Sequence, residues 1–173
     1  MYGFGIVEIP SKFILEERIL DDTIHSYGAS IEKDGVDITF SSVNLAGSNL
    51  YEDFRYNPKW SINSTEVKDF IKSTAGTLEL TAQLYLYATK ADLSQVNQVK
   101  MFAPKISQIQ GIRSLTMSGR SIGIKGEFTF NEEHRIPRNN FILLISFRCP
   151  EKDVAKWRPV FDRILDTMIL DRR

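Results

Sequence analysis

Cysteine is almost absent from this chain, since Cys149 is the only one among 173 residues. A single thiol cannot form an intrachain disulfide, and it cannot supply a cysteine-rich zinc site. Histidine is scarce too, with His25 and His134 alone available as imidazole bases or metal ligands. The sequence therefore excludes a disulfide-built scaffold and predicts neither a metal site nor a cofactor.

Long apolar runs are also absent. The longest, Phe141 to Ile145, is far shorter than the roughly twenty residues of a membrane-spanning helix. The amino terminus lacks the basic start and apolar stretch of a secretory signal. We expect no membrane span and a cytoplasmic protein. The alternative is an exported or lipid-anchored protein whose signal is not part of this chain.

Neither sign of charge is in excess, because 22 basic residues balance 22 acidic ones. Nucleic-acid binding by counterion release favours a continuous positive surface. The basic residues between Arg113 and Arg138 are interrupted by Glu127, Glu132 and Glu133, so we expect no nucleic-acid partner. Ordinary globular composition, without internal repeats or Gly/Ser linkers, predicts a single domain over residues 1–173.

The amino-terminal third of the sequence is predicted to form strands. The first is expected over Phe4 to Ile9, because Pro10 cannot donate to a sheet ladder. Residues 24–31 and 36–45 flank an Asp34-Gly35 pair that suits a tight hairpin turn. An antiparallel hairpin is therefore predicted here.

The middle third is harder to assign. Polar residues 63–66 can cap a helix over 61–75, which Gly76 would end. Residues 77–88 then alternate strictly between apolar and polar, the period of a half-buried strand. A strand is the first choice, although leucine, alanine, glutamate and glutamine leave a helix open. Residues 91–103, apolar at three-residue steps, predict a further helix that Pro104 ends.

The last third predicts a hairpin of residues 112–118 and 121–130 around Gly119-Arg120, followed by a polar loop over 131–140. Residues 141–147 are apolar on both faces, which predicts a strand near the sheet centre. After Pro150, an apolar stripe from Val154 to Met168 predicts a closing helix. Pro159 predicts either a kink or a short turn with the helix proper from Arg158.

The order of these elements resembles the PsbP-like α/β/α sandwich superfamily. The resemblance rests on an opening strand ending at Ile9-Pro10, and on Ile109-Gln110-Gly111-Ile112 leading into three antiparallel strands. The last of these ends at Phe147-Arg148-Cys149-Pro150 before the helix containing Phe161 to Leu165. The resemblance implies an α+β fold, a mainly antiparallel sheet with helices on both faces. It also implies members that mostly bind other proteins, and it implies no activity.

Candidate chemistry is sparse. His25 lies on an expected strand, and His134 lies in the polar loop, where a solvated side chain is the default. Cys149 is interpreted as a small buried residue at a strand end, with a helix-activated nucleophile as the alternative. The Glu132-Glu133 pair is interpreted as solvated surface, because adjacent carboxylates point apart. No catalytic constellation is found, and we expect no enzyme.

The leading functional hypothesis is a non-catalytic interaction or accessory module. It rests on aromatic residues and an arginine in a loop, a composition that is enriched at protein interfaces. These candidate partner-binding residues are Tyr51, Phe54, Arg55, Tyr56 and Trp60. The partner is expected to be another protein, and a homodimer is left open.

The alternative hypothesis is a small-molecule or lipid-binding domain, or an enzyme without a recognisable motif. Its cleft would be lined by Tyr85, Tyr87, Arg113 and Arg120. Stabilisation by a bound ligand would separate it from the interaction module.

Overall fold

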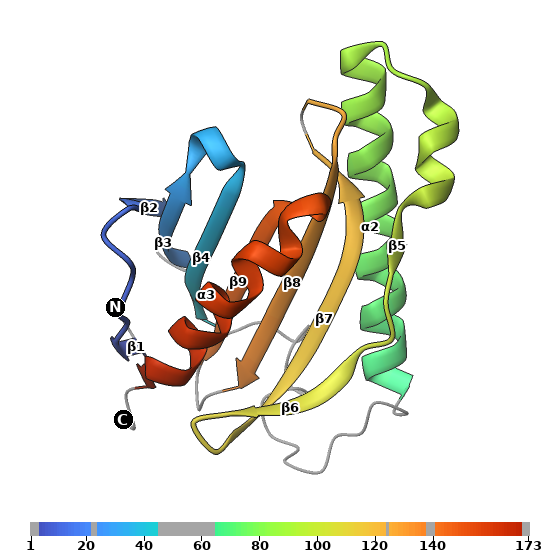
Figure 1. Cartoon of the computed structure of the whole chain (residues 1–173). Helices are drawn as coiled ribbons and strands as arrows, with labels where there is room; N and C mark the ends of the chain where they lie inside the picture. The colour runs from blue at the N-terminus through green and yellow to red at the C-terminus, as the bar shows by residue number, and fades with distance from the viewer. Residues whose placement is uncertain (1–3, 22–23, 45–64, 124, 138–140, 171–173) are drawn as a thin grey trace.

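A computed structural model describes residues 4–21, 24–44, 65–123, 125–137 and 141–170 (Figure 1). The strands are β1 Phe4–Ile6, β2 Ile14–Asp21, β3 Ile24–Ile31, β4 Val36–Asn44, β5 Lys100–Met101, β6 Lys105–Ile109, β7 Ile112–Ile122, β8 Phe128–Pro137, β9 Phe141–Pro150 and β10 Ile169–Leu170. The helices are η1 Glu32–Asp34, α2 Thr65–Thr89, η3 Leu93–Gln98, η4 Glu151–Asp153 and α3 Val154–Thr167.

Eight of the strands form one sheet in the order β2-β3-β4-β9-β8-β7-β5, with β6 also paired to β7. All of the recorded pairings between these described strands are antiparallel. The two short strands β1 and β10 pair separately. Strand β9 lies in the middle of the order, which confirms the central position predicted for residues 141–147.

The two long helices lie on opposite faces of the sheet. In Figure 1, α3 crosses in front of β8 and β9, whereas α2 runs behind β7. Helix α3 buries Trp157, Phe161 and Ile164 in the main core, and the Phe161 ring stacks on Phe147 of β9 at 4.6 Å between centroids. Helix α2 packs its Ala82 and Leu86 against Ile122 of β7. The predicted α+β class, with helices on both faces, is confirmed.

At Pro159 the structure excludes one of the two predicted alternatives, a helix proper that begins at Arg158. Helix α3 begins at Val154, after the short turn η4, and Pro159 lies inside it. Proline removes the hydrogen bond that an N–H at position 159 would donate to the Ala155 carbonyl, and its ring crowds that carbonyl, but both residues are exposed. The freed carbonyl can therefore bind water, and the helix need not begin at Arg158.

The strand predicted over 77–88 is wrong. Helix α2 runs without interruption through Gly76 to Thr89, so the predicted end at Gly76 is wrong as well. The even-numbered apolar residues form two separate i, i+4 rows on the helix. Leu78, Ala82 and Leu86 lie toward the sheet, whereas Leu80 and Leu84 are exposed. Two helical rows, offset by two residues, reproduce the alternation of a strand.

The helix predicted over 91–103 is also wrong. Its three-residue apolar spacing belongs to the 3₁₀ helix η3, in which positions i and i+3 are eclipsed. Asp92 caps η3 by accepting a hydrogen bond of 2.8 Å from the Ser94 amide. The chain then enters β5 at Lys100.

The two carboxy-terminal hairpin strands are present, but the turn predicted at Gly119-Arg120 is wrong. Strand β7 continues through both residues to Ile122, and the turn follows at Gly123 to Gly126. Gly126 has a φ of 81°, a left-handed value that favours glycine. The polar loop predicted over 131–140 is wrong as far as Pro137, because β8 occupies it. By contrast, β3 and β4 confirm the predicted amino-terminal hairpin.

Candidate functional site

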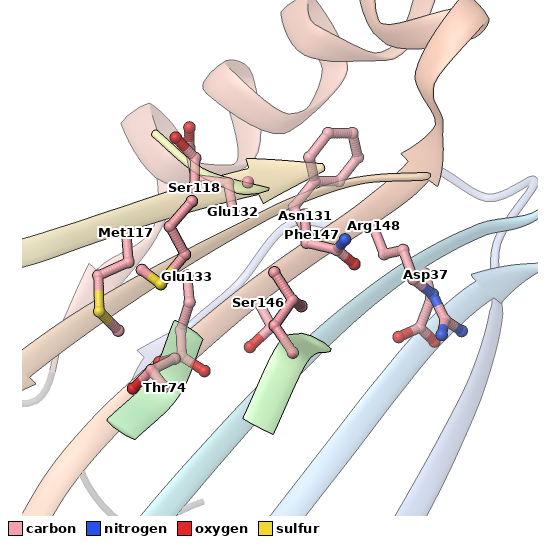
Figure 2. A pocket seen from close by; sticks show the side chains of 13 residues that line it. Asp37, Thr74, Met117, Ser118, Asn131, Glu132, Glu133, Ser146, Phe147 and Arg148 are labelled. Carbon is pink, nitrogen blue, oxygen red and sulfur yellow. The ribbon is translucent and has the colours of Figure 1, made fainter. Parts of the chain in front are cut away.

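A groove lies where α2 borders the sheet, on the face opposite α3. Its cavity has a volume of about 420 Å³. Thr74 and Leu78 of α2 form one wall, and four strands, β4, β9, β8 and β7, form the floor. Figure 2 shows Asp37 and Arg148 together at one end, with Thr74, Glu133 and Met117 toward the other.

The alternation of side chains along the central strands makes this floor polar. On β9, Ile145 and Phe147 are buried in the core under α3, so Ser146 and Arg148 face the groove. On β8, Asn131 and Glu133 lie on the groove face in the same way. Register pairs Arg148 with Asn131 and Ser146 with Glu133.

Asp37 extends the row of Asn131 and Arg148 onto the next strand. It lies directly opposite Arg148 in the β4–β9 pairing, and its carboxylate accepts a 3.1 Å hydrogen bond from the Thr39 hydroxyl. Met117 lies at the opposite end of the floor on β7, paired with Glu133. The groove therefore runs from the Asp37 and Arg148 end on β4 and β9 to an end on β7 where Met117 lies beside Glu133, whose carboxylate accepts a hydrogen bond from Arg135.

A buried polar network occupies the other face of β8, beneath α3. Glu132 and His134 are only 4% and 5% exposed. His134 Nε2 lies 2.9 Å from the Glu132 carboxylate, and its Nδ1 lies 3.1 Å from the Thr116 hydroxyl. Arg158 of α3 donates a 2.7 Å hydrogen bond to the second Glu132 oxygen.

This network keeps Glu132 ionised. Burial by itself raises the pKa of a carboxyl group, but the hydrogen bonds from His134 and Arg158 and their charges outweigh it. The pKa of Glu132 falls to about 2. Contact with Glu132 and Asp162 correspondingly raises the pKa of Arg158 against the opposing effect of burial. A charged pair between β8 and α3 thus fixes the helix on the sheet.

The order of hydroxyl, imidazole and carboxylate in this network matches a nucleophile, a base and an orienting acid. Catalysis would also require room for a substrate at the hydroxyl. Thr116 and His134 are only 2% and 5% exposed, so neither side chain is open to a substrate in this structure. Positioning α3 is therefore the role that this geometry supports.

Sequence reasoning placed these residues in solvent, and that interpretation is wrong. The charged neighbours of His134 and Glu132 favour a loop when only the sequence is considered. The available signal was the two-residue period of Glu132, His134 and Ile136, which the structure places on one buried strand face. Cys149 is fully buried, and burial together with Asp153 raises the pKa of its thiol to about 11. The thiol is thus protonated near neutral pH, as expected of a packed core cysteine.

The outer face of α2 carries an unusual row of exposed apolar side chains. Leu80, Leu84 and Tyr87 are 57%, 60% and 78% exposed, and Leu93 of η3 lies beside them at 54%. All four line one shallow cavity of about 480 Å³. We call this set the outer α2 patch.

The structure separates the residues predicted to line a ligand cleft. Tyr85 and Tyr87 lie on α2, while Arg113 and Arg120 lie seven residues apart on β7. Arg120 forms a 2.7 Å ion pair with Glu151 of η4, so it is engaged elsewhere. None of the three described cavities includes more than one of these four residues. The predicted partner-binding residues Tyr51, Phe54, Arg55, Tyr56 and Trp60 lie outside the described residues.

The described residues contain neither a membrane-spanning helix nor a cluster of metal-binding side chains. No described helix has the length and apolar character required to cross a membrane. Within the same part of the chain, His, Cys, Asp and Glu residues do not gather into a group of three able to hold a metal ion.

Comparison with known proteins supports the fold. No family model matches the chain, and no curated protein matches it either. Among solved structures, the chain is similar to PA94 of Pseudomonas aeruginosa, a protein of unknown function. The TM-score is 0.52 at 11% identity, over 94% of this chain and 100% of that one. At this identity the likeness concerns the fold alone.

Two further solved structures align with lower scores. LpqN of Mycobacterium tuberculosis, described as involved in cell envelope biogenesis, gives a TM-score of 0.48 at 8% identity, over 95% of this chain and 82% of that one. A protein from Bacteroides thetaiotaomicron gives 0.44 at 11% identity, over 100% of this chain and 50% of that one. Neither carries an argument about function.

Proposed function

We propose that this chain is a non-catalytic protein-interaction module of the accessory or assembly type, and that it binds its partner through the outer α2 patch. The observation that supports this proposal is the exposure of Leu80, Leu84, Tyr87 and Leu93 together on one surface. Contiguous exposed apolar surface is characteristic of sites where another protein docks.

The composition of α2 indicates the kind of partner. Between Gly76 and Ala88 the helix has one charged residue, Glu79, so the patch offers little for a charged surface to pair with. Burying a leucine stabilises a complex by about 1.5–3 kcal/mol. An apolar segment of another protein is therefore the partner chemistry that this patch fits.

The test compares two variants. The double variant Leu80→Gln/Leu84→Gln removes the centre of the patch, and Leu15→Gln changes a leucine that is 67% exposed on the edge strand β2. Partners are identified by crosslinking and mass spectrometry, and the dissociation constant is then measured by calorimetry with the purified partner. We expect the double variant to bind more than tenfold more weakly, because each tenfold corresponds to about 1.4 kcal/mol. Leu15→Gln should bind normally.

Undiminished binding by a folded double variant would overturn the assignment to α2. A third variant, with Tyr51, Phe54 and Trp60 all replaced by alanine, tests the loop predicted from the sequence. If only this variant loses the partner, the loop carries the interaction. Light scattering tests a homodimer, because a dimer that separates in Leu80→Gln/Leu84→Gln makes a second copy the partner.

Membership of the PsbP-like superfamily belongs to the same proposal. The antiparallel sheet with helices on opposite faces supports it, because that is the architecture the resemblance implies. A cytoplasmic location, with an exported or lipid-anchored protein as the alternative, stays a prediction. Cell fractionation of the full-length gene product would separate the two.

A further inference from the structure

The charged end of the groove holds polar side chains that have no side-chain partner among the described residues. The side chains of Ser146 and Arg148 take part in no hydrogen bond or ion pair with the described part of the chain, and Arg148 is exposed. Asp37 lies directly opposite Arg148 on the neighbouring strand, yet no ion pair within 4.0 Å joins them. The groove therefore offers a guanidinium and a carboxylate side by side.

This pairing of opposite charges restricts the ligand. A ligand with only negative groups would pair with Arg148 but would be repelled by Asp37. A ligand with only positive groups would pair with Asp37 but would be repelled by Arg148. A ligand with both an ammonium and a carboxylate on one carbon can satisfy both side chains together. A guanidinium matches a carboxylate with two parallel hydrogen bonds, and Asp37 accepts from the ammonium group.

The other end of the groove indicates what else the ligand carries. Leu78 of α2, Met101 of β5 and Met117 of β7 line it, and Glu133 of β8, which lies beside Met117, accepts a hydrogen bond from Arg135. Methionine side chains adapt their shape to apolar groups of different outline. Strand β7 is two strands away from β9, about 10 Å across the sheet. A large apolar substituent on the zwitterionic carbon would extend in this direction.

We propose that the groove between α2 and the sheet binds an α-amino acid with a large apolar side chain, held by Asp37 and Arg148 and directed toward Met117. The cavity of about 420 Å³ lies within the range of small-molecule sites, roughly 300–1,000 Å³. This site lies on the sheet side of α2, whereas Leu80 and Leu84 face away from the sheet. The amino-acid site and the outer α2 patch are therefore separate surfaces, and each proposal can be tested without the other.

Calorimetric titration of the full chain with L-phenylalanine, L-methionine and L-leucine tests the proposal. We expect saturable binding of at least one of them. Binding should weaken at least tenfold in Arg148→Gln and in Asp37→Asn, and it should be unchanged in Lys156→Gln, a surface variant on α3. The blocked compounds N-acetyl-L-phenylalanine and L-phenylalaninamide should also bind at least tenfold more weakly than L-phenylalanine, because each lacks one charge.

The blocked compounds are tested on the unaltered chain, so their result holds even if a variant fails to fold. The proposal is overturned if none of the three amino acids binds at millimolar concentration. It is equally overturned if a blocked compound binds as well as the free amino acid, or if folded Arg148→Gln keeps full affinity. Leu80→Gln/Leu84→Gln should leave amino-acid binding intact, which separates this test from that of the interaction patch.

Discussion

Gly119 lies in the middle of β7 at the place where β5 runs alongside. A Cβ at this position would lie 2.7 Å from the carbonyl oxygen of Lys100 and 3.4 Å from the Met101 Cα. Real Cβ atoms do not approach a backbone oxygen this closely, so β5 can pair here only because the side chain is missing. Glycine serves at this point as a packing residue, not as the turn residue that the sequence indicates.

Gly119→Ala should therefore destabilise the protein. We expect a loss of about 1–3 kcal/mol in the free energy of unfolding, the usual cost of overpacking, because backbone atoms cannot move aside cheaply. Gly76→Ala is the matched control, since nothing lies within 4 Å of its Cβ position inside α2. It should stabilise by about 0.5–1 kcal/mol. Urea denaturation of both variants measures the two changes in the free energy of unfolding. If both variants were stabilised, or both destabilised, this account would be wrong.

Glu132 combines burial with a charge, which makes it sensitive to acid. Its pKa of about 2 in the folded protein lies below the ordinary value of 4.5. The unfolded chain therefore binds a proton at higher pH than the folded chain does. The stabilisation is fully present above pH 4.5 and is lost as the pH falls from 4.5 toward 2. The difference between the two pKa values corresponds to about 3 kcal/mol.

We expect more than half of this contribution to be lost by pH 3. Urea denaturation of the unaltered protein and of Glu132→Gln at pH 7 and pH 3 isolates the effect. The variant should be less stable at pH 7, because Arg158 loses one of its two charged partners and keeps only Asp162, but its stability should depend less on pH. Parallel pH profiles for the two proteins would show that another carboxylate causes the loss.

Helix α2 explains what the sequence could and could not predict at the level of elements. Its apolar residues serve two surfaces, with Ala82 and Leu86 on the sheet and Leu80 and Leu84 in solvent. Periodicity assumes one buried face, so a helix that is apolar on two opposite sides imitates a strand. The good helix formers in 77–88 were the better guide. The mistaken strand and the exposed patch thus have the same cause.

The part of strand β8 from residue 131 to 137 is predicted wrongly as a loop for the opposite reason. Its buried face carries Glu132 and His134, which hydrophobic patterning assigns to solvent. Tertiary contacts with Thr116 and Arg158 help to make their burial favourable, and the two-residue period of Glu132, His134 and Ile136 does not reveal these contacts. By contrast, the apolar patterns of strand β9 and helix α3 each fit only one type of secondary structure, so the sequence predicts both elements. The groove was not predicted, because Asp37, Asn131 and Arg148 meet only through the register of three strands.

At the scale of the whole molecule, the core formed by the described residues is uneven. Beneath α3, one cluster joins 17 buried apolar residues from both ends of the described chain. The clusters on the α2 side contain two and three buried residues. Helix α2 also leaves its outer face in solvent, so it gains less from tertiary packing than α3 does. The two faces of the sheet are therefore expected to differ in local stability.

This difference predicts that α2 opens without global unfolding. Native-state hydrogen exchange should give the amides near Ala82 and Leu86 a lower opening free energy than those near Leu143 and Ile145 of β9. The opening free energy of the α2 amides should also fall less steeply with denaturant concentration than that of the β9 amides, because opening α2 exposes less surface. Gly76→Ala should raise the opening free energy of the α2 amides. The difference between the opening free energy of the β9 amides and the free energy of global unfolding should not change. Equal opening free energies in α2 and β9 would instead make the molecule one cooperative unit, and the outer α2 patch would then rest on a helix as stable as the core.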